Sequence, residues 1–343
     1  MLGIGIAGCG EVVRARHLPV LRRIRSARVV ALADPDPAAR RETAAAAPGA
    51  RVVPQTAELL DDPAIDAVLV ATPPALHADV AVEALDSGRH VLCEKPLALD
   101  VPSCGRIAEA AAASGRVATV GFNLRHHPAV KEVRDAVASG GLGRPELVQS
   151  RSTSGRRRGA GAWLADPSRG GGILFEQAVH HVDLWRFILG DELAEIHVKA
   201  AGPEQAAIVA TTEGGTLISG AFSWRTGPEN KIAVFGPRAR AAADLYTGDP
   251  AIVLAATANG GEPGARVRRA GRSIRSLPRV ASARRLGGVF NATYLTQWRS
   301  FLAAARGRQA NPCPATEGAA ATAAIRSMMF AAGLAAPEAA GAA

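Results

Sequence analysis

Apolar runs and helical stretches alternate along the first part of the chain. Short, almost unbroken apolar runs occupy Leu2–Ala7, Arg28–Ala33, Ile65–Ala71, Arg89–Cys93 and Arg116–Val120. Between them lie stretches with helical patterning, at Glu11–Ile24, Pro37–Ala47, Ala75–Ser87 and Val101–Ala113. Strands that alternate with helices of about 10–15 residues indicate βαβ units and a parallel sheet. We therefore predict an α/β domain with a parallel sheet over residues 1–122.

The pattern changes after Phe122, and a second domain is predicted over residues 123–343. Gly and Asp/Glu-Gly turn signals separate its candidate strands, which are Pro145–Ser152, Glu195–Ala201, Ala206–Thr212, Thr216–Trp224 and Lys231–Phe235. They predict an α+β arrangement, in which helices cover one face of an open, mostly antiparallel sheet. Helices are expected over Tyr294–Arg306 and Ala315–Gly333. We expect the last one to pack back toward the first domain, because its apolar face needs cover.

Composition narrows the class of protein. The chain has 343 residues, 48% hydrophobic and 21% charged, which excludes a disordered composition. No apolar stretch reaches the roughly 18 residues of a membrane span, so none is expected. The N-terminal apolar run lacks a preceding basic segment and is not expected to be a signal peptide. The four cysteines form no CxxC pair, so we expect no metal site or disulfide framework, and a location in the reducing cytoplasm.

The net charge of +9 raises the alternative of a nucleic-acid-binding protein. The arginines are, however, spread along the chain, and aromatic residues make up only 4%, so stacking platforms are scarce. We therefore expect no nucleic-acid partner. Two arginine-rich stretches, Arg156–Arg158 and 260–285, are interpreted as solvated loops, with contact to an anionic ligand or another subunit as the alternative.

A glycine turn follows the first predicted strand and opens the first helix. Its sequence is Gly8-Cys9-Gly10-Glu11-Val12-Val13. Gly8 allows the tight turn, and Gly10 lets the backbone approach a pyrophosphate at the helix N-terminus. Asp34 ends the next strand, where its carboxylate can accept hydrogen bonds from ribose hydroxyls and would repel a 2′-phosphate. This arrangement predicts a nicotinamide dinucleotide site that prefers NAD over NADP.

Two further segments lie at the carboxyl ends of predicted strands, where ligands bind in open α/β sheets. Thr72 and Pro73, with His77 behind them, are expected to line the nicotinamide side. The second segment contains Glu94 and Lys95. A lysine there can stabilise a developing alkoxide, and Glu94 is expected to hold the lysine ammonium in place. Both Glu94 and Lys95 are also expected to contribute to the cofactor site.

Together these segments resemble the glucose–fructose oxidoreductase/inositol dehydrogenase (Gfo/Idh/MocA) family, over about residues 2 to 335. Further motifs carry the resemblance: Gly121-Phe122-Asn123-Leu124-Arg125, Trp163-Leu164-Ala165-Asp166-Pro167 and Gly170-Gly171-Gly172. The resemblance implies reversible hydride transfer between a nicotinamide and a secondary alcohol of a sugar, inositol or related polyol. It also implies a homodimer or homotetramer formed through the open face of the second-domain sheet.

The family motif has an aspartate after the glycine run and a histidine four residues later. Glu176 and His180 stand in these positions here. Spacing i, i+4 places both on one face of the predicted helix Gly172–Leu189, so His180 rather than His181 is expected to be the acid/base. Lys95, His180 and Glu176 are then the catalytic candidates. Candidate substrate contacts are Asn123, Arg125, Trp163 and Asp183, and Asp183 could instead orient His180.

Two positions depart from the family motif: Glu176 replaces an aspartate, and Ala178 replaces a glycine. Either change can reshape the substrate pocket. A cofactor-binding regulatory or scaffolding protein without turnover therefore remains the alternative function.

Overall fold

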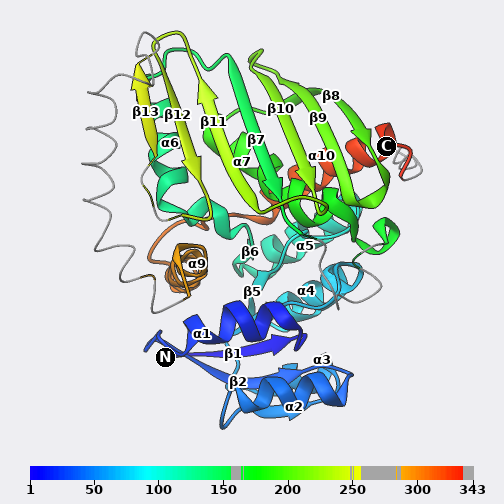
Figure 1. The fold of residues 1–343 in the computed structure, drawn as a ribbon. Coiled ribbons are helices and arrows are strands. Elements are labelled where there is room, and N and C mark those ends of the chain that lie inside the picture. The colour runs from blue at the N-terminus through cyan, green and yellow to red at the C-terminus, as the bar shows by residue number, and fades with distance from the viewer. Residues whose placement is uncertain are drawn as a thin grey trace. The chain divides into compact units, whose positions relative to one another are not determined.

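The computed structural model describes residues 1–155, 164, 166–247, 249, 251–255, 283 and 287–334. Contacts between residues divide the chain into two compact units (Figure 1). Unit 1 combines Met1–Phe122 with Tyr294–Ala323, and unit 2 combines Asn123–Thr293 with the stretch from Ala324 onward. The last long helix, α10 (Ala315–Ala331), therefore contributes its first half to unit 1 and its second half to unit 2.

Unit 1 contains a six-stranded parallel sheet in the order β3-β2-β1-β4-β5-β6. The strands are β1 (Leu2–Ala7), β2 (Ala27–Ala33), β3 (Arg51–Val53), β4 (Ala67–Val70), β5 (His90–Cys93) and β6 (Ala118–Val120). This is the strand order of a dinucleotide-binding fold, with its reversal between β1 and β4. The parallel Rossmann sheet expected from the apolar runs is confirmed.

The helices of unit 1 are α1 (Leu18–Leu21), α2 (Pro37–Ala45), α3 (Thr56–Leu60), α4 (His77–Asp86), α5 (Val101–Ser114) and most of α9 (Val289–Ala304). Two of them, α2 and α5, begin at an aspartate that caps them. Asp36 caps α2 by accepting the N–H of Ala38 at 2.8 Å, and Asp100 caps α5 by accepting that of Ser103 at 2.7 Å.

The first helix differs from the continuous α-helix expected over Glu11–Ile24. It contains a π-helical turn, η1 (Val13–His17), followed by the short α1. A π-turn accommodates an extra residue and is frequently found at functional sites. Here it ends on His17, which is completely buried.

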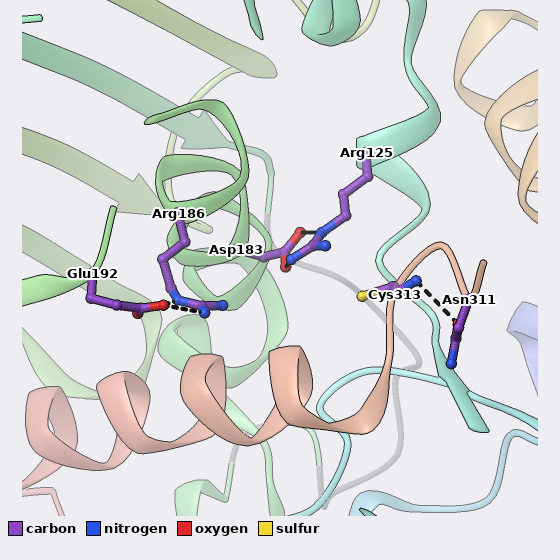
Figure 2. Close-up of polar contacts among 6 residues, drawn as sticks. All are labelled: Arg125, Asp183, Arg186, Glu192, Asn311 and Cys313. Atoms are coloured by element: carbon purple, nitrogen blue, oxygen red, sulfur yellow. Dashed lines mark hydrogen bonds and ion pairs between the residues drawn. The ribbon is translucent and has the colours of Figure 1, made fainter. Parts of the chain in front are cut away.

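The outer edge of β6 is covered by a segment from the far end of the chain. Asn311 donates to the carbonyl of Ala118 at 2.7 Å and accepts from the Thr119 hydroxyl at 2.8 Å. The N–H of Val120 donates to the carbonyl of Cys313 at 2.8 Å. Asn311 also accepts the N–H of Cys313, which folds the segment into a turn (Figure 2). The edge strand is therefore paired rather than left open to solvent.

Unit 2 contains a seven-stranded sheet in the order β13-β12-β11-β7-β10-β9-β8. Its strands are β7 (Leu147–Thr153), β8 (Leu193–Ala200), β9 (Gln205–Thr212), β10 (Leu217–Ser223), β11 (Glu229–Phe235), β12 (Ala239–Asp244) and β13 (Ile252–Ala255). All neighbouring pairs are antiparallel except β7 and β10. The mostly antiparallel sheet is thus confirmed.

Two helices, α6 (Pro128–Ala138) and α7 (Val179–Leu189), lie against one face of this sheet (Figure 1). A π-helical turn, η6 (Leu174–Ala178), precedes α7, so this helix too departs from the single α-helix expected. Burial alternates along the central strands: in β7, Val148, Ser150 and Ser152 are buried while Gln149 and Arg151 are exposed. This period of two marks a sheet with one covered and one open face.

Candidate functional site

The glycine turn has the geometry that a dinucleotide site requires. Gly8 adopts φ +96°, and a Cβ there would lie 2.4 Å from the carbonyl oxygen of Ala71, so only glycine fits. A Cβ on Gly10 would meet nothing within 4 Å, which leaves its backbone open to approach. The remaining residues of the motif run into the first helix: Glu11 is exposed, Val12 half-buried and Val13 buried. The turn therefore fits the cradle for a pyrophosphate.

Asp34 links this turn to the end of β2. Its Oδ2 accepts the backbone N–H of Cys9 at 2.7 Å, and its Oδ1 accepts that of Asp36 at 2.9 Å. Arg40 donates to the Asp34 carbonyl at 2.5 Å, so a guanidinium also lies at this strand end. Burial, followed by the Asp34 charge, raises the pKa of the Cys9 thiol to about 11, and the thiol stays protonated.

His77 connects two loops at the carboxyl edge of the sheet. Its Nε2 lies 2.8 Å from the carbonyl oxygen of Thr72, and its Nδ1 lies 2.8 Å from that of Pro96. Burial lowers the pKa of His77, although both carbonyl contacts oppose that shift. His77, behind the segment expected to line the nicotinamide side, thus ties the loop after β4 to the loop after β5. Thr72 is half-buried and Pro73 exposed on the first of these loops.

Glu94 and Lys95 follow β5 directly. Glu94 is buried, with its Oε1 2.8 Å from Nε2 of His17, and its Oε2 accepts the backbone N–H of Lys95 at 3.2 Å. Burial alone would raise the pKa of Glu94, but the His17 hydrogen bond and the nearby Lys95 charge hold it below its usual range. Glu94 is thus a carboxylate, and it holds the main chain of Lys95. The Lys95 side chain is half-buried.

In unit 2, Glu176 and His180 lie in η6 and the first turn of α7, and both are partly exposed. Their neighbour His181 is fully buried, and its Nε2 is 2.9 Å from Oδ1 of Asn230. Burial lowers the pKa of His181 to about 4. Of the two adjacent histidines, His181 is therefore committed to the core of the protein. Ala178, the departure from the family motif, is also fully buried.

Arg125 and Asp183, both expected to contact substrate, pair with each other (Figure 2). Arg125 Nε donates to Oδ2 at 2.9 Å and Nη2 donates to Oδ1 at 2.6 Å. The Arg125 guanidinium also stacks on the Phe187 ring, 4.9 Å from its centroid. Asn123 is buried and donates to the Thr293 hydroxyl at 2.8 Å. Trp163, like Arg156–Arg158 and most of the 260–285 stretch, lies outside the described residues.

Three features of these regions were not predicted. The first is a second bidentate ion pair (Figure 2), in which Nε and Nη2 of Arg186 donate to the Glu192 carboxylate at 2.6 Å each. The second is the contact of His17 with Glu94, and the third is the hydrogen bond that Trp298 donates to His17. A histidine inside an apolar helix pattern was the available signal for His17, but no local pattern connects it to a residue 281 positions away.

Two kinds of feature are absent from the described part of the chain. No three His, Cys, Asp or Glu residues there are grouped as a metal site would need. None of its helices combines the length and apolar character of a membrane span.

Comparison with known proteins identifies the two units. Residues 2–122 match the model of the Gfo/Idh/MocA oxidoreductase family with an NAD-binding Rossmann fold, and residues 130–242 match the Gfo/Idh/MocA C-terminal domain. Inositol 2-dehydrogenase 2 of Saccharopolyspora erythraea is 36% identical over 194 residues, which are 56% of this chain and 55% of that protein. The chain thus aligns with little more than half of that relative's length.

Two other proteins are similar over more of their length. Myo-inositol 2-dehydrogenase of Thermotoga maritima is 28% identical over 70% of this chain and 75% of that protein. The WlbA dehydrogenase of Bordetella pertussis, solved with NADH and UDP-GlcNAcA, superposes with a TM-score of 0.82 at 21% identity, over 96% of this chain and 95% of that one. The superposition shows a shared fold. With the two family models, which together cover more than half of the chain, it follows that the chain belongs to the Gfo/Idh/MocA family of NAD(P)-dependent oxidoreductases.

Proposed function

We propose that this protein transfers hydride reversibly between a nicotinamide dinucleotide and a secondary alcohol carbon of a sugar, inositol or related polyol. One observation carries the proposal: the only lysine of unit 1, Lys95, stands at the carboxyl end of β5 and is anchored through a buried carboxylate. In an open parallel sheet this edge is where ligands bind. The names of the inositol dehydrogenase relatives support the substrate class.

The residues of unit 1 fit a dinucleotide. Gly8 and Gly10 would lie beneath the pyrophosphate, the Asp34 carboxylate would accept the ribose hydroxyls, and Thr72 and Pro73 would line the nicotinamide. We propose NAD as the preferred form, because a second negative charge beside Asp34 is repelled. When bound, the nicotinamide supplies the hydride acceptor or donor at its C4 carbon.

We propose three roles for side chains of this chain. His180 takes the hydroxyl proton of the substrate, and an imidazole with a pKa near neutrality suits that task. The Lys95 ammonium stabilises the substrate oxygen as negative charge develops on it. Glu176, on the same helical face as His180, binds an adjacent hydroxyl or orients the imidazole. Lys95 belongs to unit 1 and His180 to unit 2.

Arg125 and Asp183 have a supporting role in this proposal. The Arg125 guanidinium and the Asp183 carboxylate bind each other, and Asp183 lies on α7, the helix that also carries His180. The pair therefore fixes α7 to the segment after β6 instead of recognising a hydroxyl group. Asn123 and Trp163 remain the proposed direct contacts with substrate.

The closing experiment screens sugars, inositols and sugar acids with NAD and with NADP, following absorbance of the reduced nicotinamide. We expect turnover of at least one secondary alcohol, lost in Lys95→Ala. Flat traces over the whole panel, with NAD still bound tightly, would favour the second candidate, a cofactor-binding protein without turnover.

The departures from the family motif motivate that second candidate, and one double variant separates the two. Glu176→Asp with Ala178→Gly restores the family pattern. In a working enzyme with an unusual substrate, the double change impairs turnover. In a chain that has lost activity, the same change raises turnover of a simple polyol.

We also propose that the protein is a homodimer or homotetramer assembled through the open face of the unit 2 sheet. Val209 on β9 and Leu217 on β10 are 48% and 45% exposed, which are unusual values for large apolar residues within strands. Sedimentation equilibrium tests this, and a monomer at micromolar concentration would contradict it.

A further inference from the structure

A series of buried hydrogen bonds connects helix α9 to the strand end that carries Lys95. The indole Nε1 of Trp298 donates to Nδ1 of His17 at 3.0 Å. On the other side of the same ring, Nε2 of His17 lies 2.8 Å from Oε1 of Glu94. Oε2 of Glu94 accepts the backbone N–H of Lys95 at 3.2 Å. All these residues belong to unit 1, and both His17 and Trp298 are completely buried.

The chemistry of the donors fixes the direction of the whole series. An indole N–H can only donate, so Nδ1 of His17 must be the acceptor. The neutral ring then carries its proton on Nε2 and donates it to the Glu94 carboxylate. Trp298 therefore selects one tautomer of His17, and that tautomer is the one that can hold Glu94.

Aromatic packing keeps the imidazole in this orientation. The ring of Tyr294 meets that of His17 edge-on at a centroid distance of 5.1 Å, and the ring of Trp298 meets it at 6.0 Å. Phe301 packs behind Trp298 at 5.7 Å. Three elements of the chain, η1, the end of β5 and α9, are thus joined at one imidazole ring.

We propose that His17 and Trp298 are positioning residues for Lys95. The inference rests on the proposed function, in which the Lys95 ammonium stabilises the substrate oxygen. By holding the Glu94 carboxylate, His17 fixes the main-chain N–H of Lys95, one bond from the Cα atom that carries the lysine side chain. Misplacing a catalytic group by about 1 Å can cost roughly 10²-fold in rate, so the supporting hydrogen bonds affect turnover without touching substrate.

The test uses four variants with defined hydrogen-bonding capacity. Trp298→Phe keeps an aromatic ring and removes the N–H. His17→Phe removes both the donor and the acceptor, whereas His17→Gln retains one of each. Trp185→Phe is the matched control, because Trp185 is an equally buried tryptophan whose Nε1 donates to the Ser150 hydroxyl at 2.8 Å in unit 2.

The first readout does not depend on activity. The chain has four lysines, at positions 95, 131, 199 and 231, so a sample labelled with [15N]lysine gives four backbone amide signals. Lys95→Arg identifies the signal of Lys95 by its disappearance. We expect that signal to move in His17→Phe and in Trp298→Phe, and to stay near its wild-type position in His17→Gln and in Trp185→Phe.

The second readout separates kcat from KM. With a substrate found by the alcohol screen, we expect kcat to fall about 10- to 100-fold in His17→Phe and less in Trp298→Phe, with KM for NAD nearly unchanged. His17→Gln should recover most of the loss. Wild-type kcat in His17→Phe, or equal losses in His17→Gln and His17→Phe, would overturn the proposal.

Failure of the proposed function would give a different result. If the wild-type protein turns over no alcohol, the amide signals alone decide whether His17 and Trp298 hold Lys95 in place. If His17→Phe does not fold, Trp298→Phe decides. An unmoved Lys95 signal in a folded Trp298→Phe protein would overturn the inference.

Discussion

Arg125 and Asp183 form a bidentate ion pair within unit 2, although 58 residues separate them in the sequence. The exposed fraction of Arg125 is 6% and that of Asp183 is 1%. Removing one partner of such a pair leaves a charge buried without compensation. Replacing both partners by apolar groups of similar size can be almost neutral.

This pair gives the first prediction. Asp183→Asn should lower the free energy of unfolding by about 3–5 kcal/mol, because the Arg125 guanidinium stays buried without its counter-charge. The double variant Arg125→Met/Asp183→Leu should be more stable than Asp183→Asn alone. Urea denaturation measures both, and an Asp183→Asn protein as stable as wild type would contradict the prediction.

The second prediction concerns the cofactor. NAD should bind at least about tenfold tighter than NADP, which corresponds to about 1.4 kcal/mol, because Asp34 repels a 2′-phosphate. Asp34→Ser should weaken this discrimination and leave the Arg40 guanidinium to meet the phosphate. Calorimetric titration with each dinucleotide is the measurement. Equal or tighter NADP binding to the wild type would show the assignment to be wrong.

The third prediction concerns the acid/base. His180→Ala and Lys95→Ala should each lower kcat by about 10²- to 10⁴-fold, with NAD affinity nearly unchanged. His197, exposed on β8, supplies the matched control, since His197→Ala changes a surface imidazole of the same unit. Full activity in His180→Ala would mean that His180 is not the acid/base, and His181 and Asp183 would be the next candidates.

The fourth prediction is a loss of stability in acid. Burial lowers the pKa of both His126 and His181 from 6.5 to about 4. Between these values the unfolded chain binds protons that the folded protein excludes, so the free energy of unfolding falls as pH falls from about 6.5 to 4. Each histidine contributes a slope of up to about 1.4 kcal/mol per pH unit.

Urea titrations at pH 7, 6 and 5 measure that slope. His181→Gln should reduce the slope of unfolding free energy against pH by the contribution of one histidine. His197→Ala should leave this slope unchanged. A slope that is the same in all three proteins would contradict the assignment of His181 as a buried, neutral imidazole.

The sequence predicted elements best where one run of residues determines one element. The apolar runs matched β1, β2, β4, β5 and β6 closely because these strands are buried in a parallel sheet. β3 has only three residues, two of them exposed, and gave no such signal. β12 reads Ala-Arg-Ala-Ala-Ala-Asp, a helix-favouring composition that becomes a strand by pairing with β11. α6 was missed although Pro128 and Val130 carried a helical pattern.

The same distinction holds for the candidate site: positions set by a single strand could be predicted from the sequence, and contacts between distant segments could not. The chain direction alone placed Asp34 and Lys95 at one edge of the sheet, because Asp34 comes immediately after β2 and Lys95 two residues after the end of β5. The partners of His77 and His17 could not be identified, because contacts between loops and distant helices depend on tertiary packing. Arg125 was expected to contact substrate, and nothing local indicated that it has a carboxylate partner in α7.

The pairing of residues 311–314 with β6 also constrains how the protein is made. A chain emerging from the ribosome completes residues 1–122 first, yet the segment that covers the β6 edge is among the last to appear. Trp298, which fixes the His17 ring, also arrives late. During synthesis the edge of β6 therefore stays unpaired until the last part of the chain has been made. Unpaired strand edges are prone to aggregation. A protein truncated before residue 294 would lack the segment that covers this edge.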